Sequence, residues 1–114
     1  MIAVIADIPP SLNRFAGRKN AWEYREQKQI WKELVYYAVL PVRPAKPYEK
    51  SVVTITYHFK DKRRRDPDNF SGKMIMDGLT AAKVISDDSF SNIELHLAGV
   101  YDGKNQTVID VKEV

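Results

Sequence analysis

The chain has 114 residues, of which 44% are hydrophobic and 29% are charged, and its formal net charge is +3. This composition indicates one globular domain, spanning 1–114, with enough apolar residues to form a core without a disulfide or a structural metal. The sequence contains no cysteine, which excludes disulfide scaffolds and thiol nucleophiles and is typical of a cytoplasmic protein. The mild excess of basic residues favours a polyanion as the partner.

The first half of the chain predicts one short strand and one long helix. Alternating apolar residues at 2–5 indicate the strand. Over 20–40 the apolar residues recur at helical spacing, and Asn20 with Glu23 forms a capping box that would begin the helix. No apolar run is long enough for a membrane span, and the start of the chain lacks the basic leader of a signal peptide. We therefore expect no contact with a membrane.

The second half predicts a strand, a helix and two further strands. Apolar and polar residues alternate cleanly over 51–60, and the pattern that follows predicts a helix from near Pro67 to about Ala82. Alternation returns at 93–98 and at 107–111, on either side of an Asp-Gly-Lys-Asn turn, which predicts a β-hairpin. The order of elements is βαβαββ. We expect an α+β fold, a two-layer sandwich in which a mixed sheet is covered by two helices.

The most informative segment lies where the strand 51–60 gives way to the second helix. It reads Lys-Arg-Arg-Arg-Asp-Pro-Asp-Asn, from Lys62 to Asn69. Asp66 and Asp68, separated by one proline, would form a small cluster of the hard oxygen ligands that Mg²⁺ prefers. The basic run before them would bind phosphates. Taken alone, an Asp-x-Asp pair more often caps a helix, and a basic run is more often a solvated face.

Further polar residues follow this segment. On a continuous helix, steps of four, four and three residues would keep four polar side chains on one side: Asn69, Lys73, Asp77 and Thr80. In that arrangement Asp77 would hold Lys73 in place near a phosphate. A second acidic pair at 87–88 could join the first pair if the chain folds back, although alone such a pair more often marks a turn.

Together these residues resemble the signature of the RusA Holliday junction resolvases, endonucleases of the prophage type. The resemblance rests on 61–69, on Lys73, on the Asp-Gly-Leu of 77–79 and on the Val-Ile-Ser-Asp-Asp-Ser of 84–89, with 9–13 similar to the family's amino-terminal loop. It implies a Mg²⁺-dependent homodimer, without a small-molecule cofactor, that binds four-way or otherwise branched DNA. Such an enzyme resolves the junction by nicking two opposing strands, as in DNA recombination and repair.

The resemblance also implies a role for each matching residue. Asp66, Asp68 and Asp88 would bind the metal and act in catalysis, and Lys73 would be the catalytic lysine. The chain has one residue more than the family pattern between Asn69 and Lys73, and on a helix that residue turns the lysine by about 100°. We expect the DNA contacts to come from the basic run and its surroundings, namely Asn13, Arg14, Lys62, Arg63, Arg64, Arg65 and Asn69.

Two other functions remain open from the sequence. A phage protein could keep the basic surface and bind branched DNA without cutting it, and the displaced Lys73 keeps this alternative open. A metal-dependent phosphohydrolase of small nucleotides is disfavoured, because the chain lacks a glycine-rich phosphate loop and its basic run is larger than a mononucleotide requires. For the homodimer, the candidate surfaces are the outer face of the aromatic-rich helix 20–40 and the edge of the carboxy-terminal hairpin.

Overall fold

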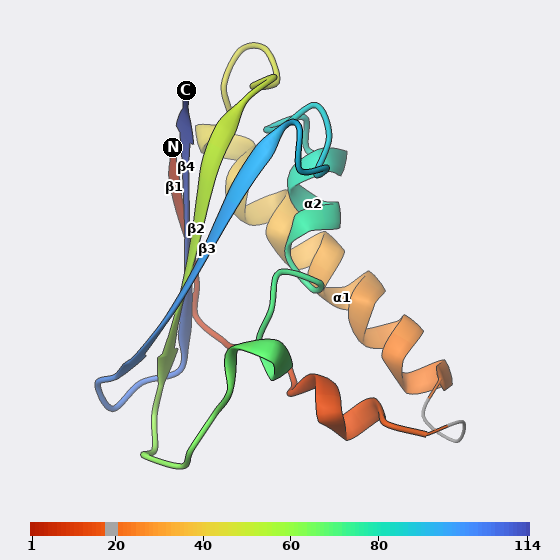
Figure 1. The fold of residues 1–114 in the computed structure, drawn as a ribbon, viewed down its shortest axis with the longest axis vertical. Helices are drawn as coiled ribbons and strands as arrows, with labels where there is room; N and C mark the ends of the chain where they lie inside the picture. Colours follow the sequence, from red (N-terminus) through yellow and green to blue (C-terminus); the bar gives the residue numbers. More distant parts are fainter. Residues whose placement is uncertain (18–20) are drawn as a thin grey trace.

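A computed structural model describes residues 1–17 and 21–114. Its fold is mixed α+β, as predicted, and a four-stranded mixed sheet carries two helices on one face (Figure 1). The strands are β1 (Ile2–Ile5), β2 (Ser51–Phe59), β3 (Ile93–Tyr101) and β4 (Gln106–Glu113). The helices are α1 (Ala21–Val39) and α2 (Met76–Ala81), with the 3₁₀ helices η1 (Leu12–Phe15), η3 (Leu40–Val42) and η4 (Pro67–Asn69). None of the helices described is both long enough and apolar enough to cross a membrane.

The prediction of a hairpin from the last two strands is wrong, because β2 lies between them in the sheet order β1-β4-β2-β3. β3 runs parallel to β2, with Ser51 opposite Ile93 and Phe59 opposite Tyr101, whereas β4 is antiparallel to both β1 and β2. The inner face of β2 is buried throughout and its outer face is half-buried, as in a central strand. The turn at 102–105 therefore crosses the end of β2 instead of joining two neighbouring strands.

Two contacts fix this turn to the strand that it crosses. His58 Nδ1 lies 2.7 Å from Asp102 Oδ2, and the Lys60 amide donates to Asn105 Oδ1 at 2.8 Å. The hydrogen bond with His58 lowers the pKa of Asp102. The sequence pattern indicates no partner for His58, since the pairing depends on a strand order that alternation alone does not specify.

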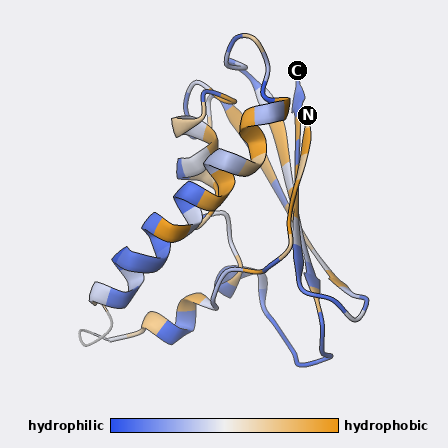
Figure 2. Ribbon diagram, turned by 180° about the vertical axis from the view of Figure 1, so that it is seen from behind, coloured by the Kyte–Doolittle hydropathy of each residue, from blue (hydrophilic) through white to orange (hydrophobic). Residues whose placement is uncertain are grey.

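Helix α1 packs a narrow apolar stripe against the sheet. Trp31, Val35 and Val39 recur every four residues and are buried, which confirms the first predicted helix, although the cap residue Asn20 lies outside the described residues. Hydrophobic residues gather where the helices face the sheet, whereas the first half of α1 is hydrophilic (Figure 2). Helix α2 meets α1 at Gly78, where a Cβ atom would lie 2.6 Å from Val35 Cβ. Only a glycine allows the two helices to pack this closely.

The second predicted helix, from near Pro67 to about Ala82, is wrong in its first half. The chain forms η4 and a series of turns there, and α2 begins only afterwards. Phe70 packs against Tyr57 and Phe59, with ring centroids 5.8 and 5.2 Å apart, and the Tyr57 hydroxyl donates to the Ser71 carbonyl at 2.5 Å. These tertiary contacts use a carbonyl that a continuous helix would pair internally, and they hold Phe70 at φ −130° and ψ 54°.

Candidate functional site

The chain leaves the sheet at the end of β2 through a hydrophilic loop at 60–66, which we call the basic loop (Figure 2). Its arginines differ sharply in exposure. The side chains of Arg63 and Arg64 are 81% and 89% exposed, whereas that of Arg65 is 10% exposed. Lys62 is exposed as well. The loop thus presents three of its four predicted DNA-binding cations to solvent and turns the fourth inward.

Two aspartates flank the basic run and pair with its arginines. Asp61 Oδ1 lies 3.1 Å from Arg63 Nε and 3.0 Å from Arg65 Nη2, and Asp66 Oδ1 lies 3.2 Å from Arg64 Nε. Hydrogen bonds from the side chain and the amide of Arg63 lower the pKa of Asp61 to about 2. Because the exposed arginines are held through Nε, their terminal nitrogens remain able to bind a phosphate.

Arg65 has a different role, because it is built into the fold. Its guanidinium carbon lies 4.3 Å from the centroid of the Phe59 ring and 5.9 Å from that of Tyr101. Its Nη1 donates to the carbonyls of Asp61 and Arg63 at 3.1 and 3.0 Å. These bonds use donors that a phosphate contact would need. Arg65 therefore fixes the basic loop against β2 and β3.

A polar pocket of about 610 Å³ opens between the basic loop and the amino-terminal loop at 8–13. The two segments meet because η1 packs beside η4. Six of the residues predicted to bind metal or DNA line this pocket, namely Asn13, Arg63, Arg64, Arg65, Asp66 and Asn69. Arg14 and Lys62 are exposed on η1 and on the basic loop and are not part of its lining. The polar pocket therefore collects most of the predicted DNA-binding residues but only one of the predicted catalytic residues, Asp66.

Lys73 and Asp88 both line a second pocket, of about 350 Å³, which we call the Lys73 pocket. Asp88 lies near Lys73 because the chain turns back there to enter β3, but it does not line the polar pocket that contains Asp66. Gly72 allows close packing at this point, since a Cβ atom on it would lie 3.1 Å from Leu95 Cδ2 of β3. Lys73 itself is exposed and lies in a turn.

The predicted polar stripe at Asn69, Lys73, Asp77 and Thr80 does not form, because no continuous helix carries it. Asp77 instead pairs with Lys28 of α1, with Nζ and Oδ2 3.5 Å apart. Thr80 Oγ1 donates to the carbonyl of Met76, within α2. Asp77 shares the Lys73 pocket but is committed to the contact between the helices, so the prediction that it holds Lys73 is wrong.

The three carboxylates predicted to bind metal are distributed over the surface. Asp66 lines the polar pocket, Asp88 lines the Lys73 pocket, and Asp68 is exposed on η4. Within residues 1–17 and 21–114, no three or more acidic or histidine side chains gather as a group that could hold a metal ion. Proteins usually hold Mg²⁺ through one or two carboxylates plus waters and substrate phosphates. The described residues therefore form no closed three-carboxylate centre, and a metal site here would depend on waters and substrate phosphates for most of its ligands.

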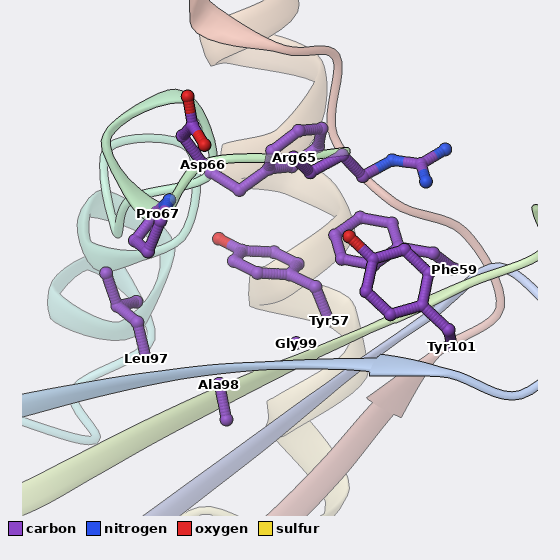
Figure 3. A pocket seen from close by; sticks show the side chains of 10 residues that line it. Tyr57, Phe59, Arg65, Asp66, Pro67, Leu97, Ala98, Gly99 and Tyr101 are labelled. Carbon is purple, nitrogen blue, oxygen red and sulfur yellow. The ribbon is translucent and has the colours of Figure 1, made fainter. Parts of the chain in front are cut away.

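A third pocket, of about 230 Å³, adjoins the polar pocket and shares Arg65, Asp66 and Phe70 with it. We call it the aromatic pocket, because the rings of Tyr57, Phe59, Phe70 and Tyr101 line it (Figure 3). Sequence reasoning missed it. The alternation of 51–60 predicts which side chains of β2 face inward, but the opening depends on how the turns at 70–75 and β3 pack on them.

The chain matches no protein-family model and no curated protein sequence. The assignment of a function therefore depends on the chemistry of the pockets and on the resemblance of the sequence motifs. Of the pockets described here, the polar pocket combines the most predicted site residues, and its cations and carboxylate are of the types that bind a phosphodiester and a divalent metal.

Proposed function

We propose that the protein is a Mg²⁺-dependent, structure-selective endonuclease that resolves four-way DNA junctions by paired nicking. The polar pocket carries this proposal, because it joins exposed arginines, a carboxylate and side-chain amides from two segments far apart in the sequence. Metal-assisted hydrolysis of a phosphodiester needs cations for the phosphates and carboxylates for the metal at one place. The similarity of the motifs to RusA resolvases supplies the class of DNA substrate and the expectation of a cytoplasmic homodimer.

The DNA backbone would bind along the mouth of the polar pocket. Arg63 and Arg64 are largely exposed there and would contact phosphates, while Asn13 and Asn69 add amide donors. Lys62, next to them in the chain, adds a further exposed cation. Contacts of this kind are electrostatic, so we expect binding that weakens steeply with salt and depends little on base sequence.

Asp66, Asp68 and Asp88 are the candidate metal ligands, and Lys73 is the candidate catalytic lysine. When bound, Mg²⁺ lowers the pKa of an attacking water and neutralises charge on the phosphate. Lys73 would stabilise negative charge in the transition state. The extra residue before Lys73 lies among turns, so it does not rotate the lysine by a fixed helical angle, and Lys73 and Asp88 line one pocket.

A protein that binds branched DNA without cutting it is the second candidate, and two observations favour it. Across the described residues the candidate ligands do not gather into one group, and Asp66 is paired with Arg64. Such a protein would keep the phosphate contacts of the polar pocket and lack the chemistry. The two candidates therefore predict the same binding and different reactions.

An assay that measures binding and cutting separately tests the proposal. Asp66→Asn, Asp68→Asn and Asp88→Asn each remove a metal ligand and a negative charge, so nicking of a labelled junction in Mg²⁺ should be lost while affinity stays equal or rises. Lys73→Ala should slow nicking by roughly 100- to 1,000-fold. Asp110→Asn makes the same charge change on β4, on the outer face of the sheet, and should leave nicking unchanged. A wild-type protein that binds the junction but leaves it intact would contradict the enzyme and favour the second candidate.

A further inference from the structure

Phosphate binding and metal binding in the proposed function do not use the aromatic pocket. We infer that it receives one unstacked nucleobase at the branch point, while the phosphate of the same nucleotide binds in the polar pocket. This inference rests on the proposed function and names the part of the DNA that the site recognises. It would make an unpaired or easily unstacked nucleotide, and not duplex DNA in general, the preferred ligand.

The two pockets adjoin. Arg65, Asp66 and Phe70 belong to the linings of both, so a nucleotide would place its base and its phosphate on the two sides of this shared wall. The polar pocket offers the exposed arginines, whereas the lining of the aromatic pocket is mostly apolar. A nucleotide has the matching shape and chemistry, with a charged phosphate at one end and a flat ring at the other.

The walls of the aromatic pocket are already fixed. Figure 3 shows Tyr57 between Pro67 and Leu97 on one side and Phe59 and Tyr101 on the other. The Tyr57 hydroxyl donates to the Ser71 carbonyl at 2.5 Å, and burial raises the pKa of Tyr57, so this donor stays protonated. A cavity with such restrained walls needs little ordering when a ligand enters, which favours binding.

The size of the aromatic pocket limits its occupant. Its volume of about 230 Å³ is below the roughly 300–1,000 Å³ of sites for drug-sized ligands, so it suits one small ring system. Tyr101 is 44% exposed and offers a ring face for stacking. The guanidinium donors of Arg65 are bonded to Asp61 and Arg63, so recognition would come from stacking, which tolerates any base.

Gly99 offers a way to close the pocket without disturbing the basic loop. It lies on β3 and lines the pocket, and a Cβ atom on it would lie 3.4 Å from Phe59 Cε2, an ordinary contact. A leucine there would fill the space that a base needs. Val100→Leu adds a comparable change to the other face of the same strand, where Val100 is 37% exposed, and serves as the matched control.

The experiment uses a four-way junction with 2-aminopurine at the branch point, titrated in Ca²⁺ in place of Mg²⁺ to suppress cutting. We expect wild type and Val100→Leu to change the fluorescence of this base, and Gly99→Leu and Tyr101→Leu to reduce the change by roughly five-fold or more. Affinity for a linear duplex, measured by anisotropy, should stay within about two-fold, because the phosphate contacts remain. Thermal melting of each variant checks that it is folded.

The outcomes separate this inference from the proposed function. If Gly99→Leu binds the junction and gives the full wild-type fluorescence change, the aromatic pocket does not receive the base, although the junction remains the substrate. Binding of free 2-aminopurine nucleoside monophosphate alone, abolished by Gly99→Leu, would keep the base pocket and overturn DNA as its source. A wild type that binds neither the junction nor the free nucleotide would overturn both proposals.

Discussion

The arginines of the basic loop differ in what they contact, and this difference determines what each can do. Arg63 and Arg64 are exposed and each is held by one aspartate, whereas Arg65 is covered and bonded to the backbone of its own loop. A consecutive run of basic residues predicts a phosphate-binding surface, and the exposure of Arg63 and Arg64 leaves them accessible for that role. The inward turn of Arg65 could not be predicted, because it depends on the rings of Phe59 and Tyr101, which lie on two different strands.

Charge removal should therefore have different effects along the run. In the double variant Arg63→Gln/Arg64→Gln, the slope of log affinity against log salt for duplex DNA should fall by nearly two units, because each phosphate contact contributes about 0.9. Arg65→Gln should lower the midpoint of thermal unfolding and change the slope much less. Anisotropy titrations over a range of salt concentrations measure the slopes. An equal fall in slope for Arg65→Gln would mean that this side chain contacts DNA after all.

The pKa of Asp61 shows whether Arg63 and Asp61 are paired in the basic loop. This pKa is lowered to about 2 by hydrogen bonds from Arg63, so in Arg63→Ala it should rise toward its ordinary value near 3.8. Since the pKa is lower in the folded state, the stabilising contact is present above the unfolded pKa and is lost as the pH falls through about 2. Titration of the side-chain carboxyl by NMR measures the change. An unshifted pKa in Arg63→Ala would contradict the pairing seen here.

Among the elements, alternation and helical spacing predicted the faces that are buried but not the neighbours of each strand. The inward residues of β2 and the buried stripe of α1 follow directly from the spacing in the sequence. The order β1-β4-β2-β3 does not, because alternation assigns a side chain to a face and carries no information on which strand lies alongside. The break between η4 and α2 was also missed, since it is caused by the contacts of Phe70 and Ser71 with β2.

The close packing of α2 against α1 at Gly78 can be tested by substitution. Alanine normally favours a helix over glycine by about 1 kcal/mol, but at Gly78 a Cβ atom would lie 2.6 Å from Val35 Cβ and 2.9 Å from the Lys32 carbonyl oxygen. We expect Gly78→Ala to reduce the free energy of unfolding by about 1–3 kcal/mol, because one of the helices must shift. Urea unfolding measures the change. Increased stability would show that the helices do not pack this closely.

At the scale of the whole molecule, the described part of the chain leaves large apolar side chains exposed on α1 and on β1, among other places. Trp22 and Tyr37 on α1 are 66% and 69% exposed, and Ile2 and Val4 on β1 are 59% and 53% exposed. The hairpin edge that the sequence suggested as an interface is not formed, since β3 and β4 are not neighbours. Paired nicking needs two sites facing one DNA, and aromatic side chains are enriched at the centres of interfaces. We therefore propose a twofold dimer through the outer face of α1.

Sedimentation at micromolar concentration tests this assembly. Wild type should sediment as a dimer, and Tyr37→Glu should shift it toward monomer because the charge would be buried at the interface. Val4→Glu makes the same change on β1 and should leave the dimer intact, provided that α1 forms the interface. A wild type that stays monomeric, both free and on a junction, would contradict paired nicking by two copies of this chain.

The central claim is that this fold cuts branched DNA with a metal held beside the polar pocket. A cleavage assay tests that claim most directly. The wild-type protein is incubated in Mg²⁺ with a labelled four-way junction, and a linear duplex of the same sequence is the control. We expect nicks in two opposing strands of the junction, no nicks in the linear duplex, and no nicks in either DNA when EDTA replaces Mg²⁺. An intact junction, or equal cutting of the linear duplex, would contradict it.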